Sequence, residues 1–555
     1  MKKQKILLIT IILLAAFLRF YKLGTYPALN ADEAAIGYNA YSLLETGKDE
    51  HGISWPLHFQ SFNDFKPGAY FYIVLPFVKF FGLNEWSVRL PNAILGVATV
   101  YLVYLLVKEL FGKKSLEIGK LRLEILTAAM LAVSPWHIHY SRGGWEVNTA
   151  TFFITLGLLL FLKSLKNPKY LLLSTLSFSL SLYTYHAARV IVPMLSLGLL
   201  IIFAKNLKEN IKSLVIAGIF GLILLTPLIW DFTGGEAGSR IAGVGIFADP
   251  GPLSRINEQR GEHGDFTALI PIVLHNKLVN FGLALVENWS DHFRGDFLFL
   301  SGDIIERNKV PETGQMYLFD LVFLLVGLAF VVLRWGKNKS YNKAWLVILW
   351  WLIIAPTAAA LTFQSPHALR AQNMVIPLVI ISAYGLLGLL GWLKETVRQK
   401  NLLFIIYCLL FITVATCFAR YQHMYWVHMS KEYPFSSQYG VKELVSYVSD
   451  NSDNFENVVV TTRYDQPYIL FLFYLKYPPE NFQKDHILSE RDEYGFSTVG
   501  KYGKFVFKQI DWDADKLVYG RSLIIGTDEE IPPEANVVGS IYGANGYKYF
   551  EVVAN

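Results

Sequence analysis

Residues 30–44 read NADEAAIGYNAYSLL and directly follow the first strongly apolar segment of the chain. After the acidic pair Asp32 and Glu33, the apolar spacing predicts a short amphipathic helix on a membrane surface. The polar loop that begins here closes with DFKPG at residues 64–68. Carboxylates in a first helical turn also offset the helix dipole, so a structural role for the pair stays open. Neighbouring helix positions point about 100° apart, so we expect one carboxylate to react and the other to orient it.

The composition is too apolar for an ordinary soluble protein. Of the 555 residues, 53% are hydrophobic and 15% aromatic, whereas only 17% are charged. The formal net charge of +5 is small and does not indicate a nucleic-acid partner. The two cysteines, Cys408 and Cys417, lie in one apolar segment, where a helix would point them in different directions. We therefore expect no disulfide.

The apolar segments predict a polytopic α-helical membrane protein. A bilayer core needs about 20 mostly apolar residues per helix, and the first segment reads as a retained anchor rather than a cleaved signal peptide. On this basis we expect about eleven transmembrane helices. They lie near residues 5–22, 88–108, 124–138, 147–163, 169–185, 188–204, 211–231, 317–334, 344–363, 374–393 and 402–419.

Lysines and arginines concentrate in alternate connections between these segments, which predicts a cytoplasmic N-terminus. The outer face then carries two long loops, 23–87 and 232–316, and everything after the last helix. We expect residues 1–420 to form a transmembrane domain and residues 421–555 to form a small extracytoplasmic α/β domain. Its expected helices lie at 441–448 and 467–474, and its strands at 457–462, 505–509, 522–527, 536–542 and 547–552.

Each short outer connection carries one arginine: Arg142, Arg189 and Arg370. Outer loops are generally poor in basic residues, so these side chains either anchor lipid headgroups or converge on a bound phosphate. Glu146 lies four positions after Arg142, a spacing at which helical side chains pair. His367 precedes Arg370 at a helix end that a lipid headgroup could reach. These residues are candidate substrate ligands.

A metal site is a weaker hypothesis. His137 and His139 lie near Glu146 in the sequence, and this spacing is weak evidence for a metal site. Histidines at a membrane interface bind no metal more often than they bind one. We therefore assign no metal ligands and require no cofactor, although a divalent metal stays possible.

The motifs resemble a known family. An Asp-Glu pair in the first outer loop, Lys66-Pro67 before an amphipathic stretch, and EWSVRLP at residues 85–91 are similar to the GT-C membrane glycosyltransferases. More narrowly, residues 5–420 resemble the superfamily of protein O-mannosyltransferases and aminoarabinose lipid A transferases. The chain departs from the frequent Lys-Pro-Pro form by having Gly68.

The resemblance implies transfer of a sugar from a polyprenyl-phosphate carrier at the outer face, with inversion at the anomeric carbon. It implies that Asp32 is the catalytic acidic residue, that Glu33 is its partner, and that Lys66 lies near the donor phosphate. A phosphate leaves without a general acid, so a base and cations suffice. The acceptor is a lipid, a glycan or a protein. Three alternatives remain: a polymerase or ligase that uses a lipid-linked oligosaccharide, a lipid or solute transporter, and a nonenzymatic sugar-binding or scaffold protein.

Overall fold

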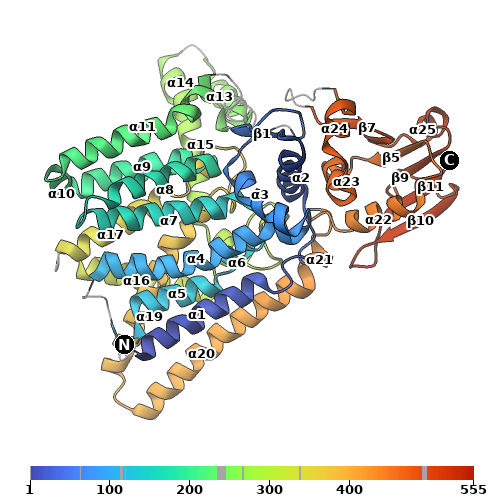
Figure 1. Cartoon of the computed structure of the whole chain (residues 1–555). Helices are drawn as coiled ribbons and strands as arrows, with labels where there is room; N and C mark the ends of the chain where they lie inside the picture. The colour runs from blue at the N-terminus through green and yellow to red at the C-terminus, as the bar shows by residue number, and fades with distance from the viewer. Residues whose placement is uncertain are drawn as a thin grey trace. The chain divides into compact units, whose positions relative to one another are not determined.

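The computed structural model describes residues 2–62, 64–112, 117–118, 121–233, 245–265, 268–336, 339–490 and 497–555 (Figure 1). Contacts divide the chain into two compact units. The first contains residues 1–19, 94–141 and 146–422, and the second contains residues 20–93, 142–145 and 423–555. The first outer loop therefore belongs to the same compact unit as the C-terminal region. The domain boundary at residue 420, predicted from composition, stays a prediction.

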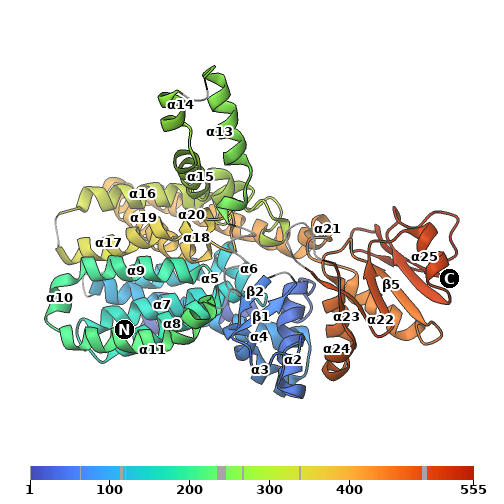
Figure 2. The same ribbon diagram turned by 90° about the horizontal axis from the view of Figure 1, so that it is seen from above.

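The first unit is a bundle of apolar helices. Helix α8 packs against α7, α9 and α11, and α16 packs on α19 (Figures 1 and 2). A helix occupies each of the eleven predicted segments: α1 (Lys2–Phe20), α4 (Glu85–Phe111), α5 (Leu123–Val133), α7 (Glu146–Ser164), α8 (Tyr170–Thr184), α9 (Ala188–Ile202), α11 (Ile211–Thr233), α16 (Leu318–Arg334), α17 (Lys339–Ile354), α19 (Val375–Thr396) and α20 (Lys400–His423). Shorter helices complete it: α6 (Pro135–Ser141), α10 (Ala204–Lys208), α13 (Gly251–Glu262), α14 (Leu269–Leu274), α15 (Lys277–Asp291) and α18 (Thr357–Ala360).

The expected count of eleven membrane spans is not confirmed. Within the described residues, seven helical stretches are long and apolar enough to cross a bilayer, whereas α5, α8 and α9 are shorter. One of the seven, Leu269–Leu300, falls within 232–316, the stretch that the sequence predicts to be an outer loop. The last stretch continues from Lys400 to Glu432, beyond the predicted end at 419. Hydropathy alone places such ends poorly because polar side chains at a helix end snorkel to the interface.

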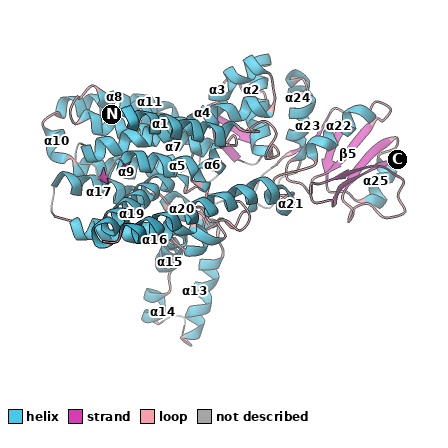
Figure 3. Cartoon of the chain, turned by 90° about the horizontal axis from the view of Figure 1, so that it is seen from below, coloured by secondary structure: helices cyan, strands magenta, loops and turns pink. Residues whose placement is uncertain are grey.

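The second unit combines the first outer loop with a mixed sheet. The loop forms α2 (Ala31–Thr46), the hairpin β1 (His58–Ser61) and β2 (Asp64–Pro67), and α3 (Ala69–Phe81). The sheet has the strand order β10-β11-β9-β5-β8-β7-β6, in which β5 runs parallel to β8 and β9. Figure 3 shows its strands in magenta. The helices and strands of the C-terminal part of this unit are α21 (Met429–Glu432), α22 (Val441–Asn451), β5 (Asn457–Thr461), α23 (Pro467–Leu475), α24 (Pro479–Asp485), β6 (Ile487–Leu488), β7 (Val499–Tyr502), β8 (Phe505–Lys508), α25 (Trp512–Val518), β9 (Ser522–Gly526), β10 (Val537–Tyr542) and β11 (Lys548–Ala554).

Every C-terminal helix and strand predicted from the sequence is present in the structure. The sequence did not predict α24, β6, β7 and α25, which are short and lack a clear apolar period. Strand β5 reads as a continuous apolar run because both of its faces are buried. Val458 and Val460 face one hydrophobic core, and Val459 faces another on the opposite side of the sheet.

The first of these cores includes residues of both the outer loop and the C-terminal region. Tyr38 of α2 and Tyr70 of α3 belong to the same buried cluster as Phe471 of α23. Gly37 lies where α2 passes α23, and a Cβ atom there would come within 2.6 Å of the ring of Phe473. Helix α2, whose first turn contains Asp32 and Glu33, is therefore packed directly on the C-terminal sheet domain.

Acidic and basic groups lie where α2 ends. Asp49 and Glu50 are fully buried, and His51 Nε2 lies 3.4 Å from Glu50 Oε1. The His51 ring also packs edge-on against His486, which follows α24. Burial by itself lowers the pKa of His51, but the neighbouring carboxylates of Glu50 and Asp49 outweigh it and raise the pKa above its usual value. Positive charge on His51 therefore stabilises this packing.

We expect the stability of the protein to fall as the pH rises above the usual histidine pKa of about 6.5 and through the raised pKa of folded His51, where this side chain loses its proton. Its stabilising charge is fully present below the unfolded pKa and is lost as the pH passes the raised folded pKa. His486 stays neutral in this range, since burial lowers its pKa. Melting temperatures of the purified protein in detergent measure the effect. The variant His51→Gln should show a smaller decline, and equal slopes for both proteins would contradict the prediction.

Candidate active site

The start of α2 is fixed by a capping box. The side-chain oxygen of Asn30 accepts a hydrogen bond from Glu33 N at 3.0 Å, and the Glu33 carboxylate accepts one from Asn30 N at 3.4 Å. This reciprocal arrangement satisfies amide groups that would otherwise lack a partner at the helix end. Glu33 therefore has the structural role that the sequence left open.

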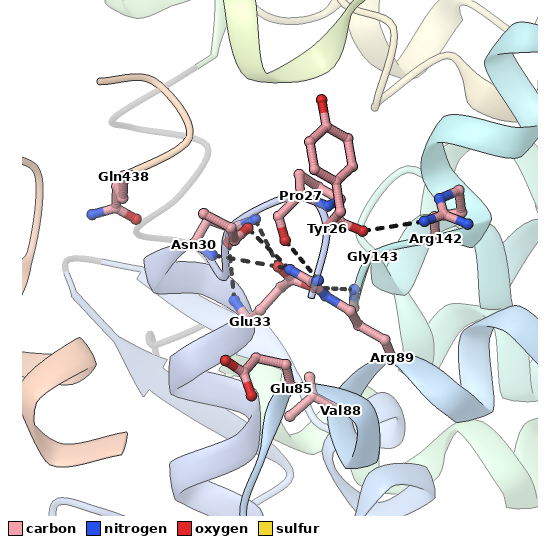
Figure 4. A network of polar contacts seen from close by, with 12 residues as sticks. Tyr26, Pro27, Asn30, Glu33, Glu85, Val88, Arg89, Arg142, Gly143 and Gln438 are labelled. Carbon is pink, nitrogen blue, oxygen red and sulfur yellow. Dashed lines mark hydrogen bonds and ion pairs between the residues drawn. The ribbon is translucent and has the colours of Figure 1, made fainter. Parts of the chain in front are cut away.

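A buried ion pair holds Glu33 more strongly. Arg89 of α4 donates from Nε to Glu33 Oε1 at 2.7 Å and from Nη2 to Oε2 at 2.6 Å, while Gly144 N donates to Oε1 at 2.7 Å (Figure 4). Glu33 is 1% exposed and Arg89 is 0% exposed. A Cβ on residue 144 would lie 3.0 Å from Val88 and 3.3 Å from Glu33, so glycine allows this close approach. These contacts indicate a positioning role for Glu33.

All five N–H groups of the Arg89 side chain have acceptors. Two bind the Glu33 carboxylate, and the other three donate to the carbonyl oxygens of Leu23, Pro27 and Ala28 at 2.9–3.0 Å. The planar guanidinium thus ties α2, α4 and the segment before α2 together. Sequence reasoning missed Arg89 as a site residue. The signal was an arginine within the apolar segment that becomes α4, since ionisable groups in such segments are commonly functional.

Asp32 has a different environment. Its Oδ1 forms an ion pair with Lys66 Nζ on β2, and the two side chains stay 22% and 12% exposed. The Lys66 ammonium also lies 5.3 Å from the centre of the Phe62 ring. Strand pairing fixes Lys66 opposite Phe59 in the hairpin. Of the two carboxylates, Asp32 is therefore the accessible one, and it lies beside a cation.

Arg142 lies against an aromatic group in the same unit. It is 1% exposed, its Nε donates to the Tyr425 hydroxyl at 2.9 Å, and its Nη2 donates to Tyr26 O at 3.2 Å (Figure 4). Its guanidinium carbon lies 4.8 Å from the centre of the Trp426 ring. The aromatic partners come from the segment after α20, which sequence reasoning assigned no role. Such stacking pre-orients a guanidinium.

The other four candidate residues lie in the first unit. Glu146 begins α7 and is buried. Arg189, in the first turn of α9, donates to Leu182 O at 3.2 Å and contacts His186 Nδ1 at 3.1 Å. Arg370 Nη1 donates to Thr362 Oγ1 at 2.6 Å. The predicted role of Glu146 as a substrate-binding residue and those of Arg189 and Arg370 as phosphate ligands stay predictions.

His367 lies in a polar network that fixes the loop before α19. Its backbone N–H donates to His292 Nε2 at 3.1 Å, and its ring lies 3.8 Å from Asp303. Asp303 also accepts from Ala368 N at 2.6 Å. Burial raises the pKa of Asp303 despite these hydrogen bonds. The network gives His367 a structural role, and its predicted role as a substrate ligand stays a prediction.

The described residues contain no group of three or more His, Cys, Asp or Glu side chains arranged to hold a metal. His137 and His139, which suggested a metal by spacing, have other partners. His137 Nδ1 lies 2.7 Å from the guanidinium of Arg19, and His139 Nε2 lies 3.0 Å from Arg307 O. A guanidinium beside a ring nitrogen opposes metal binding there by charge repulsion.

Sequence comparisons with known proteins match part of the chain. Residues 66–230 match the family model described as dolichyl-phosphate-mannose-protein mannosyltransferase. Two Bacillus subtilis proteins, named "Putative mannosyltransferase YycA" and "Putative mannosyltransferase YkcB", are 29% and 27% identical. These matches cover 40% and 42% of this chain but only 30% and 32% of the relatives. The sequence likeness thus spans less than a third of each relative.

The fold likeness extends over the whole chain. The structure of ArnT from Cupriavidus metallidurans in the apo state matches 98% of this chain and 97% of its own, with a TM-score of 0.54 and 11% identity. The chain has the GT-C fold. The oligosaccharyltransferase AglB from Archaeoglobus fulgidus matches 85% of this chain and 63% of its own, with a TM-score of 0.50 and 15% identity. The family model, the named relatives and the fold together support a GT-C membrane glycosyltransferase, as the outer-loop motifs predicted.

Proposed function

We propose that this protein is an inverting glycosyltransferase that moves a sugar from a polyprenyl-phosphate carrier to an acceptor hydroxyl on the outer face of the membrane. The observation that carries the proposal is the accessible ion pair of Asp32 and Lys66 beside the buried pair of Glu33 and Arg89. The mannosyltransferase family match and the fold of ArnT, which is also known bound to undecaprenyl phosphate, support the donor class.

The reaction is a single displacement. Asp32 takes the proton of the acceptor hydroxyl while its oxygen attacks the anomeric carbon, and the bond from that carbon to the phosphate oxygen breaks. The electron pair leaves with the polyprenyl phosphate, whose charge the Lys66 ammonium stabilises. Glu33 takes no proton in this scheme because Arg89, Asn30 and Gly144 N already occupy its oxygens.

The ion pair of Asp32 with Lys66 also suggests how donor binding activates Asp32 as a base. In the free protein Lys66 neutralises Asp32. A donor phosphate competes for the same ammonium, so its binding draws Lys66 away from the carboxylate and leaves Asp32 available for the acceptor proton. Arg142, Arg189 and Arg370 are further proposed cationic ligands of the phosphate.

We expect Lys66→Met to lower transfer about 100-fold and to raise the donor KM, because the methionine keeps the apolar stem but removes the charge. Release of free polyprenyl phosphate from polyprenyl-phosphate sugars in detergent measures the effect. Lys442→Met is a matched control, since Lys442 makes an exposed ion pair with Glu85 at 2.6 Å in the same unit. Its activity should equal that of the wild type.

The donor panel includes diphosphate-linked oligosaccharides. Release from polyprenyl-phosphate sugars supports the proposal, whereas release only from the diphosphate-linked donors would replace it with polymerase or ligase activity. Equal rates for Lys66→Met and Lys442→Met would contradict the role of Lys66.

A further inference from the structure

A tight turn precedes the C-terminal sheet domain, and one of its side chains reaches α2. Gln438 lies in this turn with a left-handed backbone (φ 54°), which is uncommon for a residue other than glycine. Its own N–H donates to Phe435 O at 3.0 Å, and Tyr439 N donates to Pro434 O at 2.9 Å. Gln438 is buried. The unusual backbone therefore presents its side chain in a fixed direction.

The oxygen and the nitrogen of the Gln438 side-chain amide both form hydrogen bonds. Its Oε1 accepts a hydrogen bond from Ala31 N at 2.5 Å, and its Nε2 donates to Asp465 O. Ala31 is the first residue of α2, so its N–H has no partner inside the helix. Figure 4 shows Gln438 beside the start of α2, next to Asn30 and Glu33. The amide thus links the sheet domain to the first helical N–H of α2.

The residues before and after Asp32 each donate a backbone hydrogen bond to a side chain. Gln438 binds the N–H of Ala31 on one side, and Asn30 binds the N–H of Glu33 on the other. The pair of Glu33 with Arg89 fixes the same turn from α4. Because a catalytic base must meet its proton within about 0.5 Å of the correct place, the position of this turn controls the reaction rate.

We propose that Gln438 is a positioning residue for Asp32, so that the C-terminal region completes the active site. This inference rests on the sugar transfer proposed above. Gln438 has no contact with substrate in this scheme and acts through the backbone of α2. It sets the distance between the Asp32 carboxylate and the acceptor hydroxyl.

The chain offers a matched control at the other end of the same helix. Gln483 of α24 donates to Ser42 Oγ at 3.1 Å, to Thr46 Oγ1 at 3.1 Å and to Asp49 O at 2.8 Å. Its contacts with Ser42 and Thr46 lie roughly 16–23 Å along α2 from Ala31, given about 1.5 Å of rise per residue. Gln438 and Gln483 therefore both attach the sheet domain to α2, but only Gln438 attaches the turn that contains Asp32.

The experiment compares Gln438→Ala, Gln438→Glu and Gln483→Ala. We expect Gln438→Ala to lower kcat about 30-fold with less than about a threefold change in the donor KM, because the base is misplaced while the donor contacts remain. Gln438→Glu keeps an oxygen for Ala31 N but loses the N–H that binds Asp465 O, so it should recover only part of kcat. Gln483→Ala should keep kcat within about twofold. Equal kcat losses at Gln438 and Gln483 would overturn the inference.

Hydrogen–deuterium exchange of segment 30–36 provides a readout that does not need activity. Exchange in this segment should be about tenfold faster in Gln438→Ala than in the wild type and unchanged in Gln483→Ala. Unchanged exchange in Gln438→Ala would overturn the positioning role. If Gln438→Ala exchanges faster but the wild-type protein transfers no sugar from any donor, the proposed function is overturned instead.

Discussion

Asp32→Asn should lower sugar transfer by at least about 1,000-fold while the protein still folds and still binds polyprenyl phosphate. The substitution keeps the size of the side chain but removes the group that accepts the proton, and general bases contribute about 100- to 10,000-fold to such reactions. Neither Asp32 nor its partner Lys66 is fully buried, at 22% and 12% exposure, so we expect the fold to tolerate the loss of the Asp32 charge. Initial rates of polyprenyl-phosphate release at saturating donor measure the effect.

Asp513→Asn is the control for this prediction. Asp513 is an exposed carboxylate of the same unit that pairs with Lys516 at 2.7 Å, and a surface pair of this kind contributes little. Its variant should transfer sugar at the wild-type rate. Turnover of Asp32→Asn within about tenfold of the wild type would show that another group takes the proton.

Arg89→Met should destabilise the protein by about 3–5 kcal/mol, which is the usual cost of leaving one partner of a buried ion pair without the other. Glu33 would then keep its hydrogen bonds from Asn30 and Gly144 but lose both charged donors. The carbonyl oxygens of Leu23, Pro27 and Ala28 would also lose their donor. Thermal unfolding in detergent and the yield of monodisperse protein measure the loss.

The double variant Glu33→Gln/Arg89→Met tests the physical reason. Since it leaves no buried charge unpaired, it should be clearly more stable than the sum of the two single variants predicts. Strictly additive losses would show that Arg89 stabilises the fold through its carbonyl contacts rather than through Glu33.

Local patterns were enough to predict much of this molecule. The apolar segments predicted a helix at each of eleven places, and the short apolar runs after residue 440 predicted five strands of the sheet. The acidic pair and the lysine before Pro67 indicated a candidate site and a family resemblance, and the structure joins Asp32 and Lys66 in an ion pair. These features are local because helix period, strand alternation and loop motifs are written in neighbouring residues.

The sequence alone determined that this is a helical membrane protein with a small α/β region and a polar first loop that resembles those of GT-C glycosyltransferases. Only the tertiary structure separated Asp32 from Glu33, because the difference depends on Arg89, which lies 56 positions away in the chain. Likewise, only the fold brings Gln438 to Ala31, across 407 positions. The burial and hydrogen bonds that decide which carboxylate can react come from residues distant in the chain, and no local pattern records those contacts.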